Sequence, residues 1–502
     1  MLKVFDRRAA KAIAREVAVI DVGSNSVRLV VYRVAGLAMT PILNEKAMAA
    51  LGRGVSPKAS PLPDKGVRIA FEALTRFRTI IDGLGVKQIE AVATSAVREA
   101  VDGVAFAARV RKELNIPLRI IDGAEEARLS ALGVLASAPQ ADGVVADLGG
   151  SSLELIRIGP KGPGAGETHL LGPLALAQDA EFDPVAVEQT ALRSFNQSGV
   201  LDAQRGDVLY AVGGAWRSIG RIDMSLTNYP LRVLQNYEMS RSEILKLCAF
   251  IAKQSKRSLE RLEDAAAKRA DTLPAAAVVL ETLIRKGGFK SVILSSYGLR
   301  EGLLLNQMSA EDRAYDPLLA GVEALVGSDE RALEFGDALE AWLEPIFEGL
   351  PQVFSPARDR TLRQATYRLA DLAGVLHPDH RADIAFEIVL RGPYAGARHE
   401  ERAFLAAAIA RRYARRPPDA GIEVFERLLS PEAGARAQAL GAALRLGADI
   451  SGRSPALLRA CPISLSNRTL RLDPIDGYES LVTDQIRRRL TQLSEAISLT
   501  TV

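Results

Sequence analysis

Near its start the chain reads Val17-Ala-Val-Ile-Asp-Val-Gly-Ser-Asn-Ser-Val-Arg-Leu-Val-Val-Tyr32, two apolar, β-branched runs joined by small polar residues. The joining segment, residues 22–26, is rich in turn-forming residues and has the length of a hairpin connection. The same pattern returns at residues 144–158, where Asp147 takes the place of Asp21. Each acidic residue ends an apolar strand and leads into a Gly/Ser-containing turn. We therefore interpret the two stretches as copies of one α/β unit.

Alternating strands and helices surround the two copies. Further strands are predicted at residues 88–93, 118–121, 207–212 and 291–295, and helices at 101–114, 125–135 and within 242–285. This alternation predicts a layered α/β architecture.

The composition changes after Lys290, the last lysine of the chain. Helical periodicity extends from about residue 318 to 446, and a short strand at 469–472 and a charged helix at 478–497 follow. We expect four parts, at residues 1–137, 138–308, 309–454 and 455–502.

The overall composition is that of an ordinary globular protein, with 48% hydrophobic and 25% charged residues among 502. The net charge of +3 permits a polyanionic partner without requiring one, and we do not expect nucleic acid as a partner. Two cysteines cannot build a disulfide framework, so a reducing, cytoplasmic location is expected. No apolar run reaches the length of a membrane span, so we expect no integral membrane segment. Residues 1–16 lack the apolar core of a signal peptide.

Three loops have the composition of anion-binding turns. They are the first loop (residues 21–26), the second loop (147–152) and the third loop (212–217), which precedes a helix. Small residues let backbone N–H groups approach an anion closely, and a helix N-terminus favours phosphate. An ordinary turn is the alternative for each of the three loops. For Arg98, a candidate phosphate ligand outside these loops, the alternative is a surface salt bridge. The candidate phosphate ligands are Ser24, Asn25, Ser26, Arg98, Gly149, Gly150, Ser151, Ser152, Gly213 and Gly214.

Three acidic residues suit roles other than phosphate binding. Asp21 would repel a phosphate, so it is better suited to holding a metal ion or a water. Glu125 and Glu126 lie in the first turn of a predicted helix, where the helix dipole alone can account for them. The functional alternative is a general base, because a carboxylate beside bound phosphates can deprotonate a water for in-line attack.

These motifs, in this order, resemble those of the exopolyphosphatase / guanosine pentaphosphate phosphohydrolase (Ppx/GppA) family. The resemblance covers about residues 17–305 and extends more loosely to the helical remainder. Its motifs are Ile20-Asp-Val-Gly-Ser-Asn-Ser-Val-Arg-Leu29, Ala93-Thr-Ser-Ala-Val-Arg-Glu-Ala100, Asp122-Gly-Ala-Glu-Glu-Ala-Arg-Leu129, Ala146-Asp-Leu-Gly-Gly-Ser-Ser-Leu-Glu154, Val212-Gly-Gly-Ala-Trp-Arg217 and Tyr297-Gly-Leu-Arg-Glu-Gly-Leu303.

The resemblance implies an α/β fold with two tandem actin-like (ribonuclease H-like) ATPase-fold domains around a cleft. A mostly α-helical, HD-like C-terminal domain would follow. It also implies removal of the terminal phosphate from inorganic polyphosphate, or hydrolysis of guanosine pentaphosphate to the tetraphosphate. Such enzymes use a divalent cation, usually Mg²⁺, and the resemblance suggests a homodimer. Whether a monovalent cation is also needed is left open.

The resemblance assigns roles to individual residues. Glu126 would be the general base, and Asp147 and Glu154 would be catalytic by holding the metal or the attacking water. Asp21 would support the metal beside the first loop. The candidate phosphate ligands named above keep that role.

The sequence departs from the family pattern at three places. Ser151 stands where relatives commonly have glycine, which would strain the backbone if that position requires positive φ. Trp216 is bulky where relatives are small, so it either narrows the cleft or packs on the neighbouring helix. Ala370 precedes Asp371 where a His-Asp metal pair would stand, so we expect a non-catalytic helical domain.

The helical part holds twelve arginines between Arg358 and Arg416. They either extend an anionic track for a long substrate or form solvated helix faces paired with Asp and Glu.

Exopolyphosphatase activity is the preferred function, and guanosine pentaphosphate 5′-phosphohydrolase activity is the nearest alternative. A kinase of the same fold and a non-enzymatic polyphosphate or nucleotide sensor are the rivals from other classes.

Overall fold

The predicted hairpin at residues 17–32 is present in the computed structural model. Strands β1 (Arg15–Val22) and β2 (Val27–Ala35) pair antiparallel, with Asp21 opposite Arg28. The structure describes residues 14–53, 59–176, 182–202, 208–262, 269–327, 329–498 and 500–501. The chain divides into a first unit, Met1–Ala314, and a second unit, Tyr315–Val502.

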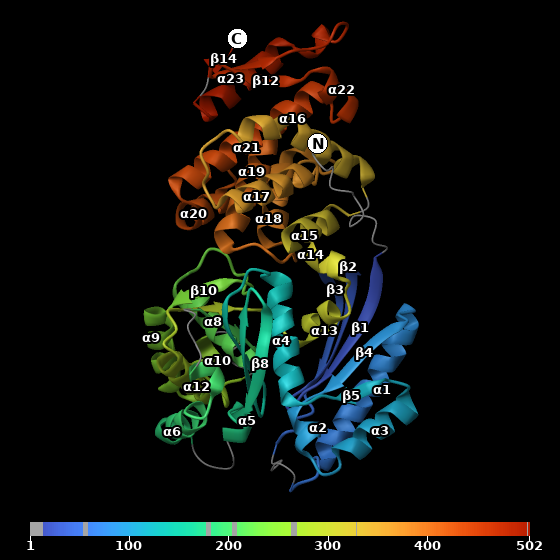
Figure 1. The fold of residues 1–502 in the computed structure, drawn as a ribbon, viewed down its shortest axis with the longest axis vertical. Coiled ribbons are helices and arrows are strands. Elements are labelled where there is room, and N and C mark those ends of the chain that lie inside the picture. The colour runs from blue at the N-terminus through green and yellow to red at the C-terminus, as the bar shows by residue number, and fades with distance from the viewer. Residues whose placement is uncertain are drawn as a thin grey trace. The chain divides into compact units, whose positions relative to one another are not determined.

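The first unit begins with a five-stranded sheet, in the order β3-β2-β1-β4-β5 (Figure 1). Strands β4 and β5 run parallel to β1, and the hairpin strands β2 and β3 form the other side. The apolar faces of its strands and helices form one core. The further elements are β3 (Ala38–Ala47), α1 (Asp64–Leu84), β4 (Gln88–Ala93), α2 (Ser95–Glu99), α3 (Gly103–Leu114) and β5 (Leu118–Ile120).

The second sheet of this unit has six strands, in the order β10-β11-β9-β6-β7-β8. Its hairpin β6–β7 repeats the design of β1–β2, since Asp147 lies opposite Glu154 and the parallel neighbour is β9. The strands are β6 (Gly143–Leu148), β7 (Leu153–Gly159), β8 (Gly162–His169), β9 (Val208–Val212), β10 (Tyr237–Ser240) and β11 (Ser291–Leu294).

Helices cover the second sheet and join it to the first. Helix α4 lies between the two sheets in Figure 1, where it packs against β8 and α13. The helices are α4 (Gly123–Ser137), α5 (Pro173–Leu176), α6 (Pro184–Phe195), α7 (Gly199–Asp202), α8 (Gly214–Leu226), α9 (Arg241–Ala252), α10 (Lys256–Leu262), α12 (Leu273–Gly287), α13 (Leu299–Asn306) and α14 (Ala310–Ala314).

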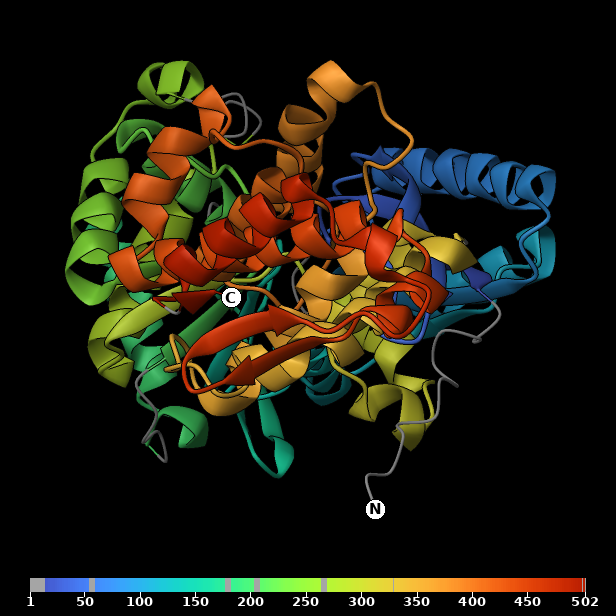
Figure 2. The same cartoon turned by 90° about the horizontal axis from the view of Figure 1, so that it is seen from above.

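The second unit is mostly helical and ends in a small sheet in the order β12-β13-β14. Figure 2 shows β12 and β13 as a two-stranded ribbon beside the last helix, α23. Its elements are α15 (Pro317–Val326), α16 (Glu330–Phe347), α17 (Pro356–Leu369), η1 (Pro378–His380), α18 (Arg381–Arg391), α19 (His399–Tyr413), α20 (Asp419–Leu428), α21 (Pro431–Ser451), α22 (Pro455–Ala460), β12 (Ile463–Ser466), β13 (Thr469–Leu472), η2 (Glu479–Leu481), α23 (Asp484–Ala496) and β14 (Thr500–Thr501).

Local capping signals fix where several helices begin. The Asp122 side chain accepts a hydrogen bond from the Glu125 backbone N–H at 2.7 Å, so α4 starts there and carries Glu126 in its first turn. Ser240 and Glu243 form a capping box at the start of α9. The helix predicted from residue 478 begins only at Asp484, because Thr483 caps it.

Several expected elements differ in extent. The helix-like stretch 242–285 forms α9, α10 and α12, while residues 263–268 lie outside the described residues. Asp207, expected to start β9, and residues 1–13 also lie outside them. Within the described part of the chain, no helix combines the length and apolarity needed to cross a membrane.

Candidate active site

The first and second loops share one turn geometry. The Gly23 N–H donates to the Ser26 carbonyl oxygen at 3.1 Å, and the Gly149 N–H donates to the Ser152 carbonyl oxygen at 2.9 Å. Each bond closes a tight turn at the end of a strand hairpin. The two acidic, Gly/Ser-rich loops therefore have the same backbone design.

Glycines let the loops approach one another. A Cβ added at Gly150 would lie 3.1 Å from Ser24 Cβ, so the tips of the two loops are in contact. In the third loop, Gly213 has a φ of 113°, and an added Cβ there would strike the Leu148 carbonyl. Only glycine fits this position, and α8 begins at the next residue, Gly214.

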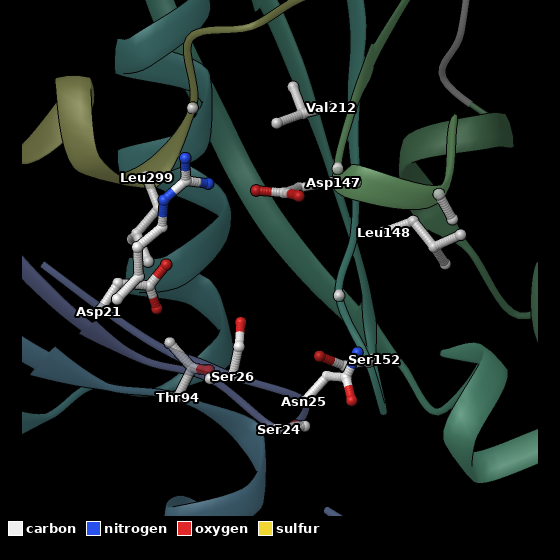
Figure 3. Close-up of a pocket in the computed structure, with 18 of the residues that line it drawn as sticks. Asp21, Ser24, Asn25, Ser26, Thr94, Asp147, Leu148, Ser152, Val212 and Leu299 are labelled. Atoms are coloured by element: carbon white, nitrogen blue, oxygen red, sulfur yellow. The ribbon is translucent and has the colours of Figure 1, made fainter. Parts of the chain in front are cut away.

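The three loops surround a cavity of about 200 Å³. Figure 3 shows Asp21 and Asp147 on opposite walls, with their carboxylates turned toward the space between. Arg98, Ser151 and Glu154 do not line this cavity. The predicted site residues that do line it are Asp21, Ser24, Asn25, Ser26, Glu126, Asp147, Gly149, Gly150, Ser152, Gly213 and Gly214.

Glu126 is a buried carboxylate held by one arginine. Arg98 Nη1 donates to Glu126 Oε2 at 2.9 Å and to the Ile121 carbonyl at 3.1 Å. Burial raises the pKa of Glu126 to about 7; Arg98 opposes this rise, and Asp147 and Asp21 add to it. A carboxylate with a pKa near neutrality can act as a general base. Arg98 lies against this carboxylate, and its expected role as a phosphate ligand stays a prediction.

Asp147, which is half-buried at the cavity wall, and Glu154, which is buried, lie near Glu126. Burial raises the pKa of Asp147, although the Ser130 hydroxyl donates a hydrogen bond to its Oδ2. Burial, followed by repulsion from Glu126 and Asp147, raises the pKa of Glu154 well above its usual range. Glu154 Oε1 is buried without a hydrogen-bond partner among the described residues. This corner of the site thus holds excess negative charge that a cation would relieve.

Cations crowd the rest of the cavity. Five cationic side chains line it. One of them, Arg300, forms an ion pair, with its Nη1 3.1 Å from Asp21 Oδ2, and the other four make no ion pair with a described residue. Burial, with added repulsion from Arg269, lowers the pKa of Lys46 to about 8. Burial and Arg300 lower the pKa of Arg217 to about 10. The five cations that line the cavity are Arg28, Lys46, Arg217, Arg269 and Arg300.

Equivalent positions of the two copies differ in charge beyond the shared aspartate. Cross-strand registers define one row in each sheet, starting from the acidic residue of each loop. In the first sheet this row is Asp21, Arg28 and Lys46. In the second sheet it is Asp147, Glu154 and Thr168. The first sheet therefore presents cations for an anionic group, and the second presents carboxylates for a water or a metal ion.

Arg300 is anchored by the residue that follows it. Glu301 Oε2 accepts from the Gly298 N–H at 2.9 Å, and its Oε1 accepts from the Tyr32 hydroxyl. These bonds fasten the start of α13 to β2 in the first sheet. They hold Arg300, which is largely buried, with its guanidinium at the cavity wall.

The cations were missing from the predicted site. Arg28, Arg217 and Arg300 lie inside the recognised motifs, so an arginine within a phosphate-binding motif was a usable signal. Lys46 and Arg269 lie in no motif. Strand pairing with Arg28 brings Lys46 to the cavity, and a loop far along the chain brings Arg269.

Neither departure near the loops disturbs the cavity. Ser151 does not have positive φ, so the strain considered for a serine at this position is absent. Its hydroxyl faces Gly52, where an added Cβ would lie 2.6 Å from Ser151 Oγ. Trp216 is fully buried, and its Nε1 donates to the Ala276 carbonyl at 3.0 Å. It packs inside the second-sheet core and does not line the cavity.

Two sheets of repeated hairpin design on either side of a cationic cavity define an actin-like fold. The chain belongs to the Ppx/GppA phosphatase family, whose sequence profile matches residues 30–311. A second profile, described as "Exopolyphosphatase, C-terminal", matches residues 341–500. The predicted family and fold class are confirmed.

Named relatives agree with this assignment. Exopolyphosphatase 1 of Mycobacterium leprae (strain TN) is 28% identical over 307 residues, which cover 58% of this chain and 89% of that protein. Exopolyphosphatase 2 of Mycobacterium tuberculosis (strain ATCC 25618 / H37Rv) is 27% identical over 314 residues, covering 58% and 98%.

Solved structures share the fold. An exopolyphosphatase from Cytophaga hutchinsonii superposes with a TM-score of 0.54 at 22% identity, covering 59% of this chain and 99% of that one. The Aquifex aeolicus member of the Ppx/GppA family gives a TM-score of 0.50 at 22% identity, covering 58% and 97%.

Proposed function

We propose that this phosphatase-family protein is an exopolyphosphatase, which hydrolyses the terminal phosphoanhydride bond of inorganic polyphosphate and releases orthophosphate. The observation that carries the proposal is the charge of the cavity. Five cations line it, and four of them have no ion-pair partner among the described residues. Such a lining suits a substrate whose every unit is negatively charged.

The chain's own groups bind the end of the polyphosphate in two ways. Backbone N–H groups and hydroxyls of the first and second loops bind the terminal phosphate. Arg28 and Lys46 from the first sheet, with Arg217 and Arg300, offset the charge of the adjoining phosphates. Electrostatic stabilisation of this kind is the main catalytic contribution available for phosphoryl transfer.

Glu126 acts as the general base. Its carboxylate accepts a proton from a water as the water oxygen bonds to the terminal phosphorus. The bridging P–O bond breaks, and the leaving chain, one unit shorter, keeps the bond's electron pair. Arg98 holds Glu126 in place, and the proton passes to solvent after phosphate release.

A divalent cation, Mg²⁺ as proposed from the family, fits the acidic corner of the site. Within the described part of the chain, no three His, Cys, Asp or Glu side chains form a metal cage. Mg²⁺ needs none, because it is commonly held by one or two carboxylates and the substrate phosphates. One or two of the proposed ligands Asp147, Glu154 (whose Oε1 is unbonded) and Asp21 would hold it together with the substrate phosphates. Bound there, it would neutralise charge that develops on the phosphoryl oxygens.

Phosphate release from polyphosphate of defined lengths, with Mg²⁺ and no acceptor, tests the proposal. Wild type should release phosphate, and Glu126→Gln should lower kcat by at least about 100-fold while still binding substrate. The matched control is Glu125→Gln, since Glu125 is the neighbouring acid and pairs with Arg119 instead. Binding without any release by wild type would favour a sensor, and release that needs an acceptor would favour a kinase.

Guanosine pentaphosphate 5′-phosphohydrolase activity is the alternative within the family. The same cavity can bind its 5′-phosphates, so the substrates must be compared directly. We expect a higher kcat/KM for long polyphosphate than for guanosine pentaphosphate in parallel assays. The opposite order would assign the nucleotide as the substrate.

Two further expectations follow from the family. We propose a homodimer, which light scattering would detect as twice the monomer mass, and a cytoplasmic location, which fractionation would test. Phosphate release compared in Na⁺ and K⁺ would decide whether a monovalent cation takes part.

A further inference from the structure

Most arginines of the second unit have an internal partner. Arg358 pairs with Glu401, and Arg368 with Glu323. Three arginines of this unit are at least nine-tenths buried, namely Arg363 (8% exposed), Arg402 (1%) and Arg412 (9%).

These three buried side chains differ in their bonding. Arg363 forms two hydrogen bonds to Glu344, and Arg402 donates to the carbonyls of Leu390, Gly392 and Tyr394. Arg412 forms no hydrogen bond or ion pair with a described residue, and its Nε is buried. The Tyr413 ring lies 4.8 Å from its guanidinium carbon.

The neighbours of Arg412 are also cationic. Arg411 has a buried Nη1 without a partner among the described residues. Helix α21 packs against α19 and adds Arg445, and α23 packs against α21 and adds Arg489 (Figure 1). Burial and then repulsion from Arg489 lower the pKa of Arg445, which shows that these two groups lie close together.

Among the described residues, two carboxylates lie near these four arginines, Asp449 and Asp371. Asp449 lies 3.1 Å from Arg489 Nε. Asp371 also faces Arg412, but both its oxygens are bound at 3.2 Å by Arg453. Since Arg453 offsets Asp371, the four guanidinium groups have Asp449 as their one described counter-ion, which leaves a net charge of about +3.

The helix dipole does not account for this arrangement. Arg411 and Arg412 lie in the last turn of α19, where a positive charge is favourable. That effect explains their position but leaves the buried N–H groups without acceptors. A buried, unpaired charge is costly, so the missing component is an anion with several acceptor oxygens.

We propose that the second unit binds a small phosphate-class anion, such as phosphate or pyrophosphate, among α19, α21 and α23, through Arg411, Arg412, Arg445 and Arg489. Guanidinium groups bind tetrahedral oxyanions by paired, charge-assisted hydrogen bonds. A multiply charged phosphate matches the net charge, whereas a carboxylate supplies one charge. The site is made of other residues than the active site and does not depend on the proposed function.

Hydrogen exchange on the full-length protein tests this site locally. Pyrophosphate without added metal should slow amide exchange in residues 405–414, 440–450 and 484–494. Arg445→Gln should weaken the apparent affinity for this effect by roughly tenfold, the value of one charge-assisted hydrogen bond. The loops at residues 21–28 and 147–153 report separately on the active site and should respond as in wild type.

A second variant, a control variant and other anions complete this experiment. Arg411→Gln is the second variant in case Arg445→Gln does not fold, and the exposed Arg471→Gln is the matched control, which should leave the response unchanged. Phosphate and sulfate compare oxyanions, and acetate should give no protection. Absence of protection in wild type, or protection that persists in both arginine variants, would overturn the proposal.

Discussion

Arg98 controls when Glu126 can act as a base. Burial raises the pKa of Glu126 to about 7, and Arg98 is the main group that opposes this rise. Replacing Arg98 by Gln should therefore move this pKa further up. A base must be deprotonated, so the acid limb of the kcat/KM profile should shift from about 7 to higher pH. A shift of one unit would lower kcat/KM at pH 6 about tenfold.

The control for this experiment is Arg109→Gln, because Arg109 forms an exposed ion pair with Glu113 on α3. Its pH profile should match wild type. If Arg98→Gln weakens substrate binding but leaves the acid limb in place, Arg98 acts as a phosphate ligand, as the motif alone suggested.

Lys46 sets the alkaline limit of the free enzyme. Its pKa is lowered to about 8 by burial and by the surrounding arginines, so it is charged below pH 8 and neutral above. We expect kcat/KM for polyphosphate to fall as the pH rises through about 8, since one phosphate contact then loses its charge. Lys46→Arg should move this limb beyond pH 9. Lys46→Met should remove the limb and lower kcat/KM roughly tenfold at pH 7.

The outcome for Lys46→Arg is the decisive one. An alkaline limb that stays near pH 8 in this variant would assign the titration to another group. Arg33→Lys, at an exposed position on the neighbouring strand, serves as the matched control and should leave the profile unchanged.

The sequence indicated the two loops that line the cavity because their turn signals are local; their phosphate-binding role stays a prediction. Six consecutive residues specify the turn from Gly23 to Ser26, so the sequence pattern contains all the information needed. The role of Arg98 was less accessible, since its contact with Glu126 depends on where α2 and α4 pack. Lys46 could not be predicted, because only the register between β2 and β3 brings it beside Arg28.

At the scale of elements, two helices carry the proposed base and one of the cations that line the same cavity. Helix α4 holds Glu126, and α13 holds Arg300. They cross at glycines, since a Cβ added at Gly302 would overlap the Leu129 carbonyl and one at Gly133 would overlap Gly298. The distance between the base and the substrate-binding arginine therefore depends on this close packing.

Gly302→Ala should force the two helices apart. The overlap is with backbone, so no rotamer change relieves it, and the expected loss of stability is about 1–3 kcal/mol. We also expect a kcat at least about tenfold lower, because Glu126 and Arg300 separate. Urea unfolding and phosphate release measure the two effects.

The control is Gly83→Ala, at an exposed position near the end of α1 where an added Cβ meets nothing within 4 Å. It should match or slightly exceed wild-type stability, as Ala is the better helix former. Equal stability and activity of Gly302→Ala and Gly83→Ala would mean that α4 and α13 tolerate separation.

Strands whose sequences favour other structures were not predicted. β8 reads Gly162-Pro-Gly-Ala-Gly-Glu-Thr-His169, a composition typical of a loop. It forms a strand because β7 supplies its hydrogen bonds and α4 packs against it. Helix α1 is different: Asp64 in its first turn and a regular apolar face were readable signals. Tertiary packing overrides the local sequence preference at β8, whereas the start and the apolar face of α1 can be predicted from its sequence.

At the scale of the whole molecule, two groups of arginines stand out in the arginine-rich segment, apart from Arg411 and Arg412. Arg358, Arg363 and Arg368 are paired with Glu, as one interpretation expected, but they are largely buried inside the second unit and form no solvated face. Arg360, Arg415 and Arg416 are exposed and make no ion pair with a described residue, so they fit the alternative of an anionic track.

Charge reversal of this second group distinguishes the two interpretations. A long polyphosphate extends far beyond a cavity of about 200 Å³, whereas tripolyphosphate is short. Replacing Arg360, Arg415 and Arg416 by Glu should raise KM for long chains about fivefold or more and weaken its salt dependence, with less than about twofold change for tripolyphosphate. The matched variant replaces the exposed Arg459, Arg471 and Arg488 by Glu, which changes the net charge equally. If both variants change long-chain KM equally, net charge alone is responsible, and if neither does, the exposed arginines are solvated faces without a substrate role.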